Sequence, residues 1–342
     1  NTTNDNEKLF YDLKRLYRNS NFKDNMKIII KSDNLDLIYN FKSVIGSGSC
    51  GYIFQYDKIN HGEKCYNSYV LKFGLDGEED TSKSESTLHY ILDSFQKITT
   101  NSCKDFECMQ IIPNLDSILL TKDNFYHIIM EKVDYELGSF FNKFNPLVRI
   151  NYSKNHKLSI TNEVGEFIFW NNYLEFLLQM SLKLILLQDN FKFMHNDLKC
   201  NNILVKAKND RKRLFDSNSN DNLDYTNLCF LMCDLGGASY IYGGKKYEGT
   251  ILGSNSKFNR CKDLFHLVHM HLAFSEFRDR LISFIKFFEI FELDYRLISR
   301  KKEKWLKIYT YVEDGNKIHD SFNPRVLKEK LIKISKYSKE NI

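Results

Sequence analysis

The stretch FKFMHNDLKCNNILV, Phe191–Val205, defines the fold of this chain more clearly than any other part of the sequence. An apolar start, FKFM, leads into a polar turn at residues 195–202, and a second apolar run, ILV, follows at residues 203–205. Short apolar runs bounded by turn residues predict buried strands. We therefore expect a polar loop held between two buried strands.

The polar turn has the residue order H-x-D-x-K-x-x-N, which is the order of a phosphoryl-transfer catalytic loop. Asp197 would orient an acceptor hydroxyl and take its proton, and Lys199 would neutralise charge on the moving phosphate. The amide oxygen of Asn202 suits a hard cation such as Mg²⁺. An ordinary Asx-rich surface turn is the alternative for this motif alone. The loop resembles that of the eukaryotic protein kinases.

Length and composition indicate two lobes and argue against several classes of protein. A chain of 342 residues with 42% hydrophobic and 14% aromatic content exceeds the size at which one core usually splits. The net charge of +5 is modest and indicates neither a nucleic-acid nor a membrane binder. Eight cysteines without metal-type spacing, and no apolar leader, favour a reducing intracellular compartment. No apolar run approaches the length of a membrane span.

A glycine-rich motif, G-x-G-x-x-G, lies between an apolar run that ends at Ile45 and an alternating run at residues 52–56. This order predicts strand, glycine turn and strand, unlike a dinucleotide fingerprint or a Walker loop. Glycines at these positions let backbone N–H groups approach nucleotide phosphates, although a simple glycine-rich hairpin is the alternative. The kinase resemblance implies that Ile53 covers the adenine ring. The expected nucleotide-binding residues of this motif are Gly46, Ser47, Gly48, Ser49, Gly51 and Ile53.

Lys72 lies within an apolar run, SYVLKFG, that predicts a strand. A lysine there either faces solvent or pairs with an anion, because burying an unpaired ammonium group is costly. The kinase resemblance implies that Lys72 binds the ATP phosphates and pairs with a helix glutamate. We choose Glu85, because apolar residues follow it with helical spacing and would dock a helix on the sheet. The acidic pair at residues 78–79 lies in a loop-like segment and is a weaker candidate.

The segment FYHIIMEKVDYELGSFF predicts a strand from Tyr126 to Met130, a short linker and the start of a helix. It resembles the hinge between kinase lobes. The resemblance implies that Met130 lies at the back of the adenine pocket and that backbone groups near Glu131 to Val133 meet the adenine. A core strand that ends in a charged turn is the alternative.

The apolar run at residues 228–232 leads to Asp234 in the sequence CDLGG, which resembles the kinase Asp-Phe-Gly motif with Leu235 in place of Phe. A carboxylate that follows a buried strand and precedes a Gly-Gly turn is well placed to bind Mg²⁺. A plain Asx turn at a strand end is the alternative. The motifs occur together in the kinase order, and this conjunction makes a purely structural explanation of each one improbable.

These motifs predict an α+β protein with a bilobal, kinase-like fold. We expect an N-terminal extension at residues 1–36, a small β-rich N-lobe at 37–131 and a larger, mostly helical C-lobe at 132–342. Polar, irregular composition predicts insertions near residues 145–165 and 206–226.

The sequence departs from the kinase pattern at Asn196 and again after Asp234. Asn196 stands where many protein kinases have an arginine that pairs with an activation-loop phosphate, so we expect activity without that switch. No Ala-Pro-Glu motif follows Asp234, and Asp263 is expected to begin a large buried helix. His266, His269 and His271 in that helix are expected to be packed or capping residues rather than a metal site.

The resemblance implies a serine/threonine protein kinase that uses ATP and Mg²⁺, with Mn²⁺ as an alternative, and a protein substrate with a Ser or Thr acceptor. Lys199 favours Ser/Thr over Tyr specificity. The short segment after Asp234 resembles divergent kinases of poxviruses and other large DNA viruses, which implies a host cytoplasmic or virion location. The phrase ESTLHYIL resembles casein kinase one. The alternatives are a pseudokinase scaffold or activator and a small-molecule phosphotransferase of the aminoglycoside or choline kinase type.

Overall fold

The computed structural model describes most of the chain in two compact units. Described residues up to Ile98 and from Ile112 to Val133 form one unit, and the other described residues form the second. The protein is mixed α+β, as predicted, with most of the strands in the first unit and most of the helices in the second. The described residues are 27–32, 35–48, 51–60, 63–74, 79–102, 110–120, 125–133, 135–143, 159–207, 228–249, 257–274, 289–291 and 320–340.

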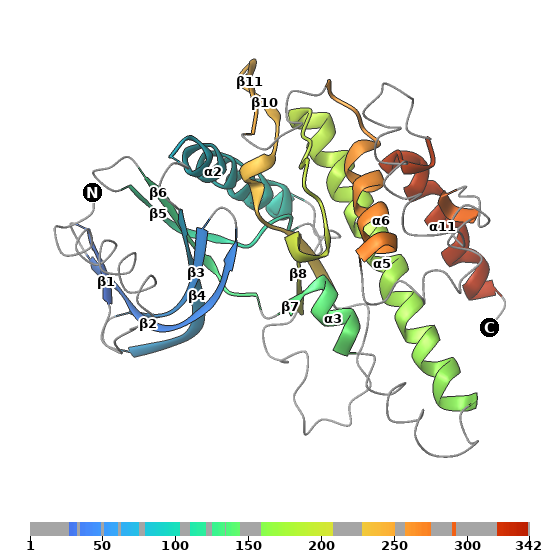
Figure 1. The fold of residues 1–342 in the computed structure, drawn as a ribbon, viewed down its shortest axis with the longest axis horizontal. Helices are drawn as coiled ribbons and strands as arrows, with labels where there is room; N and C mark the ends of the chain where they lie inside the picture. The colour runs from blue at the N-terminus through green and yellow to red at the C-terminus, as the bar shows by residue number, and fades with distance from the viewer. Residues whose placement is uncertain are drawn as a thin grey trace. The chain divides into compact units, whose positions relative to one another are not determined.

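The first unit is built on a six-stranded antiparallel sheet with the strand order β1-β2-β3-β4-β6-β5 and carries one long helix, α2 (Figure 1). Its elements are β1 (Lys27–Ser32), β2 (Leu35–Gly48), β3 (Gly51–Asn60), β4 (Glu63–Gly74), α2 (Glu79–Ser102), β5 (Leu115–Leu120) and β6 (Tyr126–Glu131). Strand β1 lies within the predicted N-terminal extension, and the residues before it lie outside the described residues.

Helix α2 docks on the sheet through an apolar face and a set of polar ties. Leu88, Ile91 and Leu92 are buried, as their helical spacing predicts. The Nε2–H of His89 donates to the carbonyl oxygen of Pro113 at 3.0 Å, and the N–H of Leu115 donates to an Asp93 carboxylate oxygen at 3.0 Å. These bonds fix the helix to the segment that leads into β5.

The second unit combines a three-stranded antiparallel sheet, β7-β8-β9, with long helices and a small hairpin, β10-β11. Its larger elements are β7 (Tyr135–Glu136), α3 (Leu137–Lys143), α5 (Ser159–Phe191), β8 (Ile203–Ala207), β9 (Leu228–Met232), β10 (Tyr240–Tyr242), β11 (Lys245–Tyr247), α6 (Lys262–Phe274) and α11 (Pro324–Glu340). The described residues of this unit also form the short 3-10 turns η1 (Cys200–Asn202), η3 (Leu235–Gly237) and η4 (Asp320–Phe322).

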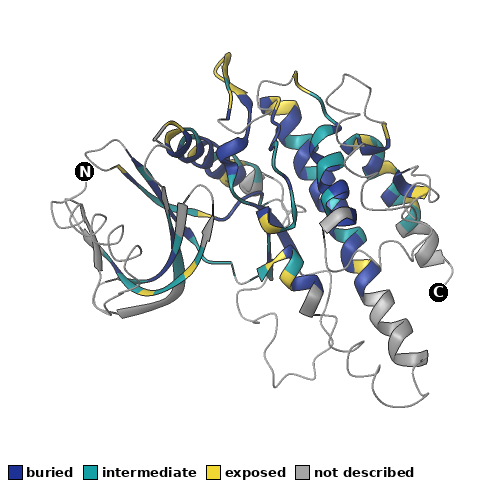
Figure 2. Ribbon diagram, viewed as in Figure 1, coloured by how far each residue is buried: buried dark blue, intermediate teal, exposed yellow. Residues whose placement is uncertain are grey.

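An aromatic core holds α5 against α3, β9 and α6. Tyr173 and Phe176 of α5 pack on Phe141 of α3, with ring centroids 5.8 and 6.5 Å away. Phe176 also meets Phe230 of β9 at 5.2 Å and His271 of α6 at 5.9 Å. In Figure 2, dark blue buried residues recur along the described parts of α5 and α6, with teal residues of intermediate burial between them. Large buried rings of this kind dominate core stability. They fix the position of α5, and therefore of the start of the loop that follows it.

Two local predictions are wrong. Phe191 is the last residue of α5 rather than part of a strand, and before the polar loop only Met194 pairs, in a single bridge to Ser239. Phe191 continues the buried apolar face of α5, so the helix extends into the apolar run that was predicted to be a strand. Helix α5 also begins at Ser159, inside the predicted insertion at 145–165. The second insertion was predicted near residues 206–226. Of these, residues 208–226 lie outside the described residues.

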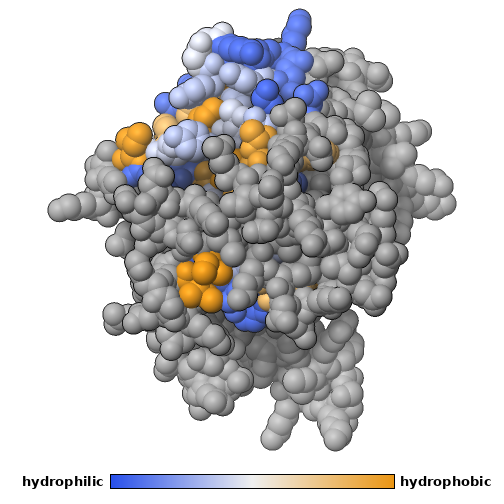
Figure 3. All heavy atoms as spheres, turned by 90° about the vertical axis from the view of Figure 1, so that its left-hand side faces the viewer, coloured by the Kyte–Doolittle hydropathy of each residue, from blue (hydrophilic) through white to orange (hydrophobic). Residues whose placement is uncertain are grey.

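No helix among the described residues is long and apolar enough to cross a membrane. The surface exposes a few large apolar side chains, among them Ile45 and Ile98. In the face shown in Figure 3, described hydrophobic residues lie next to hydrophilic ones. Scattered exposed apolar residues are usual on protein surfaces.

Candidate functional site

The loop between α5 and β8 brings together the three residues predicted to carry the chemistry. The Lys199 ammonium group lies 2.7 Å from Asp197 Oδ2, and the Asn202 amide nitrogen donates to the same oxygen at 3.0 Å. The Asn202 nitrogen also donates to the backbone carbonyl of Asp197 at 2.8 Å. Turn η1 makes this geometry possible, because it folds the chain back within the five residues from Asp197 to Asn202.

These contacts leave one side-chain oxygen of Asp197 and one of Asn202 outside the hydrogen bonds within the loop. Both side-chain hydrogen bonds to Asp197 use Oδ2, and Oδ1 accepts none from another described residue. Because the Asp197 carbonyl can only accept a hydrogen bond, the amide nitrogen of Asn202 faces Asp197 and the amide oxygen of Asn202 points away from Asp197. The side chain of Asp197 is 22% exposed and that of Lys199 is 34% exposed. The loop therefore leaves Asp197 Oδ1 and the amide oxygen of the buried Asn202 as candidate ligand contacts, with the Lys199 cation beside them.

Buried polar contacts fix the backbone beneath this loop. Asp263, in the first turn of α6, accepts the N–H of His195 at 2.9 Å and the N–H of Asn196 at 3.0 Å. Burial raises the pKa of the Asp263 carboxyl, and these two N–H bonds oppose that rise. The Nε2–H of His195 donates to the carbonyl of Cys233 at 3.0 Å. Asp263 was predicted only as the start of a helix, and its contact with the loop requires the tertiary fold.

Asp234 stands at a strained position directly beside the same loop. The N–H of Cys233 donates to the carbonyl of Asn202 at 3.0 Å, so Asp234 is the next residue after a bond to the loop. Asp234 adopts the left-handed conformation, with φ 58° and ψ 63°. Non-glycine residues in this region are uncommon, and they cluster at functional sites. The second unit thus holds Asp197, Asn202 and Asp234 on directly bonded segments.

In the first unit, the predicted pair of Lys72 and Glu85 is confirmed. The Lys72 Nζ lies 2.6 Å from Glu85 Oε1, and the two side chains are 13% and 7% exposed. Lys72 sits in mid-strand on β4, opposite Ile53 on β3 and Ile128 on β6. The helix therefore supplies the anion that a buried strand lysine requires.

The glycine motif forms the predicted hairpin. Gly46 pairs with Ile53, and Gly48 pairs with Gly51, so the motif is the turn between β2 and β3. A Cβ at Gly46 would have no atom of a described residue within 4 Å, so on this side the backbone is open among those residues. Of the other predicted residues, Ser47 lies on β2, and Ser49 lies outside the described residues.

An apolar cluster lies beside Lys72. Val70 of β4, Ile128 and Met130 of β6 form its buried centre, and Ile53 packs against it from β3. The kinase resemblance implied that Ile53 covers the adenine ring and that Met130 lies at the back of the adenine pocket. The sheet register brings both into the same cluster.

The segment after β6 has most of its N–H groups engaged. The N–H of Glu131 donates to the carbonyl of Asn114 at 2.9 Å, and the N–H of Lys132 donates to the carbonyl of Ser68 at 3.0 Å. The backbone of Val133 makes no hydrogen bond with another described residue. Of the predicted backbone contacts, the N–H of Val133 is thus the donor that remains for a ligand.

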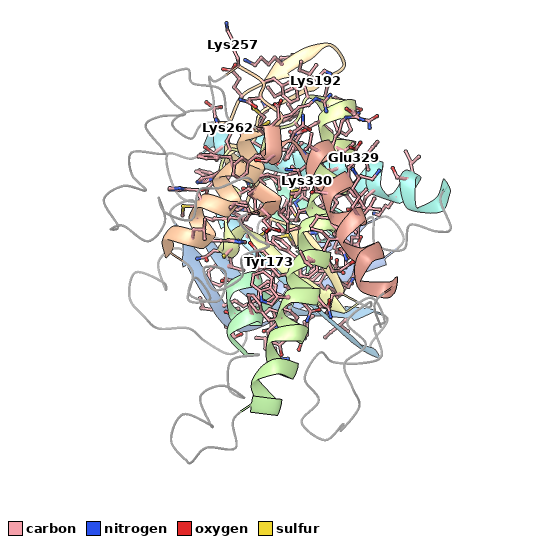
Figure 4. All side chains as sticks on the ribbon, turned by 90° about the vertical axis from the view of Figure 1, so that its right-hand side faces the viewer. Tyr173, Lys192, Lys257, Lys262, Glu329 and Lys330 are labelled. Atoms are coloured by element: carbon pink, nitrogen blue, oxygen red, sulfur yellow. The ribbon has the colours of Figure 1, made fainter. Side chains whose placement is uncertain are left out.

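The histidines of α6 are packed residues. His271 Nδ1 and the Tyr173 hydroxyl are hydrogen-bonded at 2.9 Å in the buried core, and Figure 4 labels Tyr173. Burial lowers the pKa of His271 to about 3 and that of His266 to about 4. Within the described part of the chain, no three His, Cys, Asp or Glu side chains are grouped to hold a metal ion.

Comparison with known proteins assigns no family, because no family model and no curated protein matches this chain.

Proposed function

We propose that the protein is a serine/threonine protein kinase that transfers the γ-phosphate of ATP to a protein hydroxyl. The observation that carries this proposal is the geometry of Asp197. One of its carboxylate oxygens is held by Lys199 and Asn202, and the other accepts no hydrogen bond from a described residue. A fixed carboxylate with one available oxygen suits a group that orients a hydroxyl and takes its proton.

The neighbouring residues have complementary roles. Lys199 is held 2.7 Å from the carboxylate, so its charge can offset the charge of a phosphoryl group that arrives there. The two bonds made by Asn202 keep Asp197 in one orientation and prevent it from turning with the substrate. Because phosphoryl transfer depends on positioning and charge neutralisation, such constraints favour the transition state.

Residues of the first unit supply what ATP requires. The open backbone at Gly46 suits phosphate oxygens, and the Lys72 ammonium group, held by Glu85, suits a phosphate charge. The apolar cluster that includes Ile53 and Met130 suits the face of a purine, and the N–H of Val133 suits its polar edge. These are four independent features with the same ligand preference.

The oxygen-donor set fits Mg²⁺, or Mn²⁺ in its place. Mg²⁺ in nucleotide sites usually takes one or two protein oxygen ligands together with phosphates and water. The Asn202 amide oxygen points away from Asp197, and Asp234 follows a residue bonded to Asn202. Asn202 and Asp234 would hold the cation, which would supply neutralisation of phosphate charge.

The proposal places the chain with divergent Ser/Thr kinases such as those of large DNA viruses, acting in the host cytoplasm or the virion. Two other functions share part of the machinery. A small-molecule phosphotransferase would use the same Asp197 and Asn202, and a pseudokinase would bind ATP without turnover. The geometry favours the protein kinase over a pseudokinase, because Lys72, Asp197 and Asp234 are all retained and the Lys72 pair is formed.

The acceptor decides among these functions. The purified chain is incubated with γ-labelled ATP and Mg²⁺, first with a mixture of basic and acidic proteins and then with aminoglycosides and choline. We expect label on Ser and Thr and none on the small molecules. Label on a small acceptor alone would replace the proposal with the small-molecule function. ATP binding that Lys72→Met weakens, without any labelled product, would replace it with the pseudokinase.

A further inference from the structure

Asn196, the residue before Asp197, uses both ends of its side-chain amide to join three segments. Its nitrogen donates to the carbonyl of Gly237 at 2.9 Å and to the Ser239 hydroxyl at 3.2 Å. Its oxygen accepts a hydrogen bond from the Lys262 ammonium group at 3.0 Å. Figure 4 labels Lys262, which begins α6. One amide therefore connects the loop of Asp197, the turn that follows Asp234 and helix α6.

The residue type is suited to this position. Asn196 has φ 65°, a left-handed conformation that asparagine adopts more readily than most residues. An arginine at residue 196 would have no acceptor for Lys262 and would place a second cation beside it. The arginine seen in many protein kinases would thus oppose the contacts that this chain makes.

The turn after Asp234 is also held from other directions. The backbones of Ser239 and Met194 exchange two hydrogen bonds, at 2.8 and 2.9 Å. Gly249 is buried so close to Gly237 that a Cβ there would lie 2.5 Å from the Gly237 carbonyl oxygen. The start of the segment at residues 237–249 is thus bonded to Met194, and Gly249 at its end lies against Gly237.

We propose that Asn196, Lys262 and Ser239 form a phosphate-independent clamp that holds the turn after Asp234 in its working position. The clamp rests on the proposed kinase function, and it makes the enzyme active without phosphorylation of residues 235–249. Asn196 acts as a positioning residue, because it contacts Gly237 and Ser239 and is placed between Asp197 and the turn. The three bonds join Asn196 to a backbone carbonyl, a hydroxyl group and the Lys262 cation.

The test compares Asn196→Ala with the wild type by kinetics and by amide hydrogen exchange. Without the clamp, we expect kcat to fall roughly 10- to 100-fold, because small displacements of positioning groups have effects of that size. KM for ATP should change little, since the proposed purine contacts lie in the first unit. Exchange should quicken at the amides of Ala238 and Ser239, whose hydrogen bonds close the turn. Treatment of the wild type with a phosphatase should leave kcat unchanged.

Two further variants keep the test decisive. Asn190→Ala is the matched control, because Asn190 bonds to its own helix at an exposed site, and it should keep wild-type kinetics and exchange. Ser239→Ala removes one of the three bonds and should produce a smaller change in the same direction, even if Asn196→Ala fails to fold. Unchanged exchange at residues 238–239 in both clamp variants, or loss of wild-type activity after phosphatase treatment, would overturn the clamp. If the wild type transfers no phosphate at all, the proposed function fails, while the exchange data still decide the clamp.

Discussion

The ion pair of Lys72 and Glu85 allows the structure of the first unit to be tested without any assumption about activity. Its atoms lie 2.6 Å apart, and the side chains are 13% and 7% exposed. Removing one member of a nearly buried pair leaves an uncompensated charge, which costs about 3–5 kcal/mol. Because Lys72 retains some exposure, we take the lower end and expect about 3 kcal/mol for Lys72→Met or Glu85→Leu. The double variant replaces both charges with apolar groups and should cost less than either single change.

The assay is amide hydrogen exchange of the full chain across a urea series, read on peptides of β4 and β6. This reports the opening free energy of the first unit alone, which matters because two units need not unfold together. Lys97→Met is the matched control, since Lys97 is 58% exposed in its pair with Asp93 on the same helix, and it should cost less than about 1 kcal/mol. If the effects of the two single variants add to within about 0.5 kcal/mol in the double variant, the pair is not coupled and the reasoning is wrong.

Three other predictions concern the second unit. Burial lowers the pKa of His271 from 6.5 to about 3. Below pH 6.5 the unfolded state therefore binds more protons than the folded state, so the free energy of unfolding decreases by up to about 1.4 kcal/mol for each pH unit of acidification. His271→Gln, which can still bond to the Tyr173 hydroxyl, should flatten this loss in urea midpoints measured between pH 7 and 5. Gly249→Ala places a Cβ against the Gly237 backbone and should destabilise the fold by about 1–3 kcal/mol, seen as a lower thermal midpoint. Burial raises the pKa of Asp189, but hydrogen bonds from two arginines outweigh this effect, so the pKa is lowered. Asp189→Asn should therefore lower the free energy of unfolding by under about 1 kcal/mol at pH 7. This difference from the wild type should vanish as the pH falls through the lowered pKa.

Local patterns predicted much of the first unit. The strand period around the glycines predicted the hairpin that the structure contains. The kinase resemblance implied a helix glutamate as the partner of Lys72, and the helical spacing after Glu85 selected the residue that forms the pair. Both depend on short-range periodicity, together with the cost of burying an unpaired lysine. The contact of Asn202 with Asp197 is also local, because η1 joins them within one turn.

Contacts between distant segments could not be predicted in this way. Asp263 reaches the backbone of His195 across 68 residues, and no local pattern encodes that approach. Asn196 was identified only by the absence of an arginine, whereas its partners Gly237 and Lys262 lie 41 and 66 residues away in the sequence. The error at Phe191 has a related cause, because a short apolar run does not distinguish a strand from a helix end.

The central claim is that Asp197 is the carboxylate that serves phosphoryl transfer to a protein hydroxyl. The most direct measurement is the rate of transfer from γ-labelled ATP and Mg²⁺ to protein under single-turnover conditions, for the wild type and Asp197→Asn. Asp189→Asn is the control, because it makes the same chemical change at an exposed residue of the same unit. We predict that Asp197→Asn lowers the rate by about 100-fold or more while ATP still binds, and that Asp189→Asn keeps the wild-type rate. Wild-type transfer by Asp197→Asn would contradict the account.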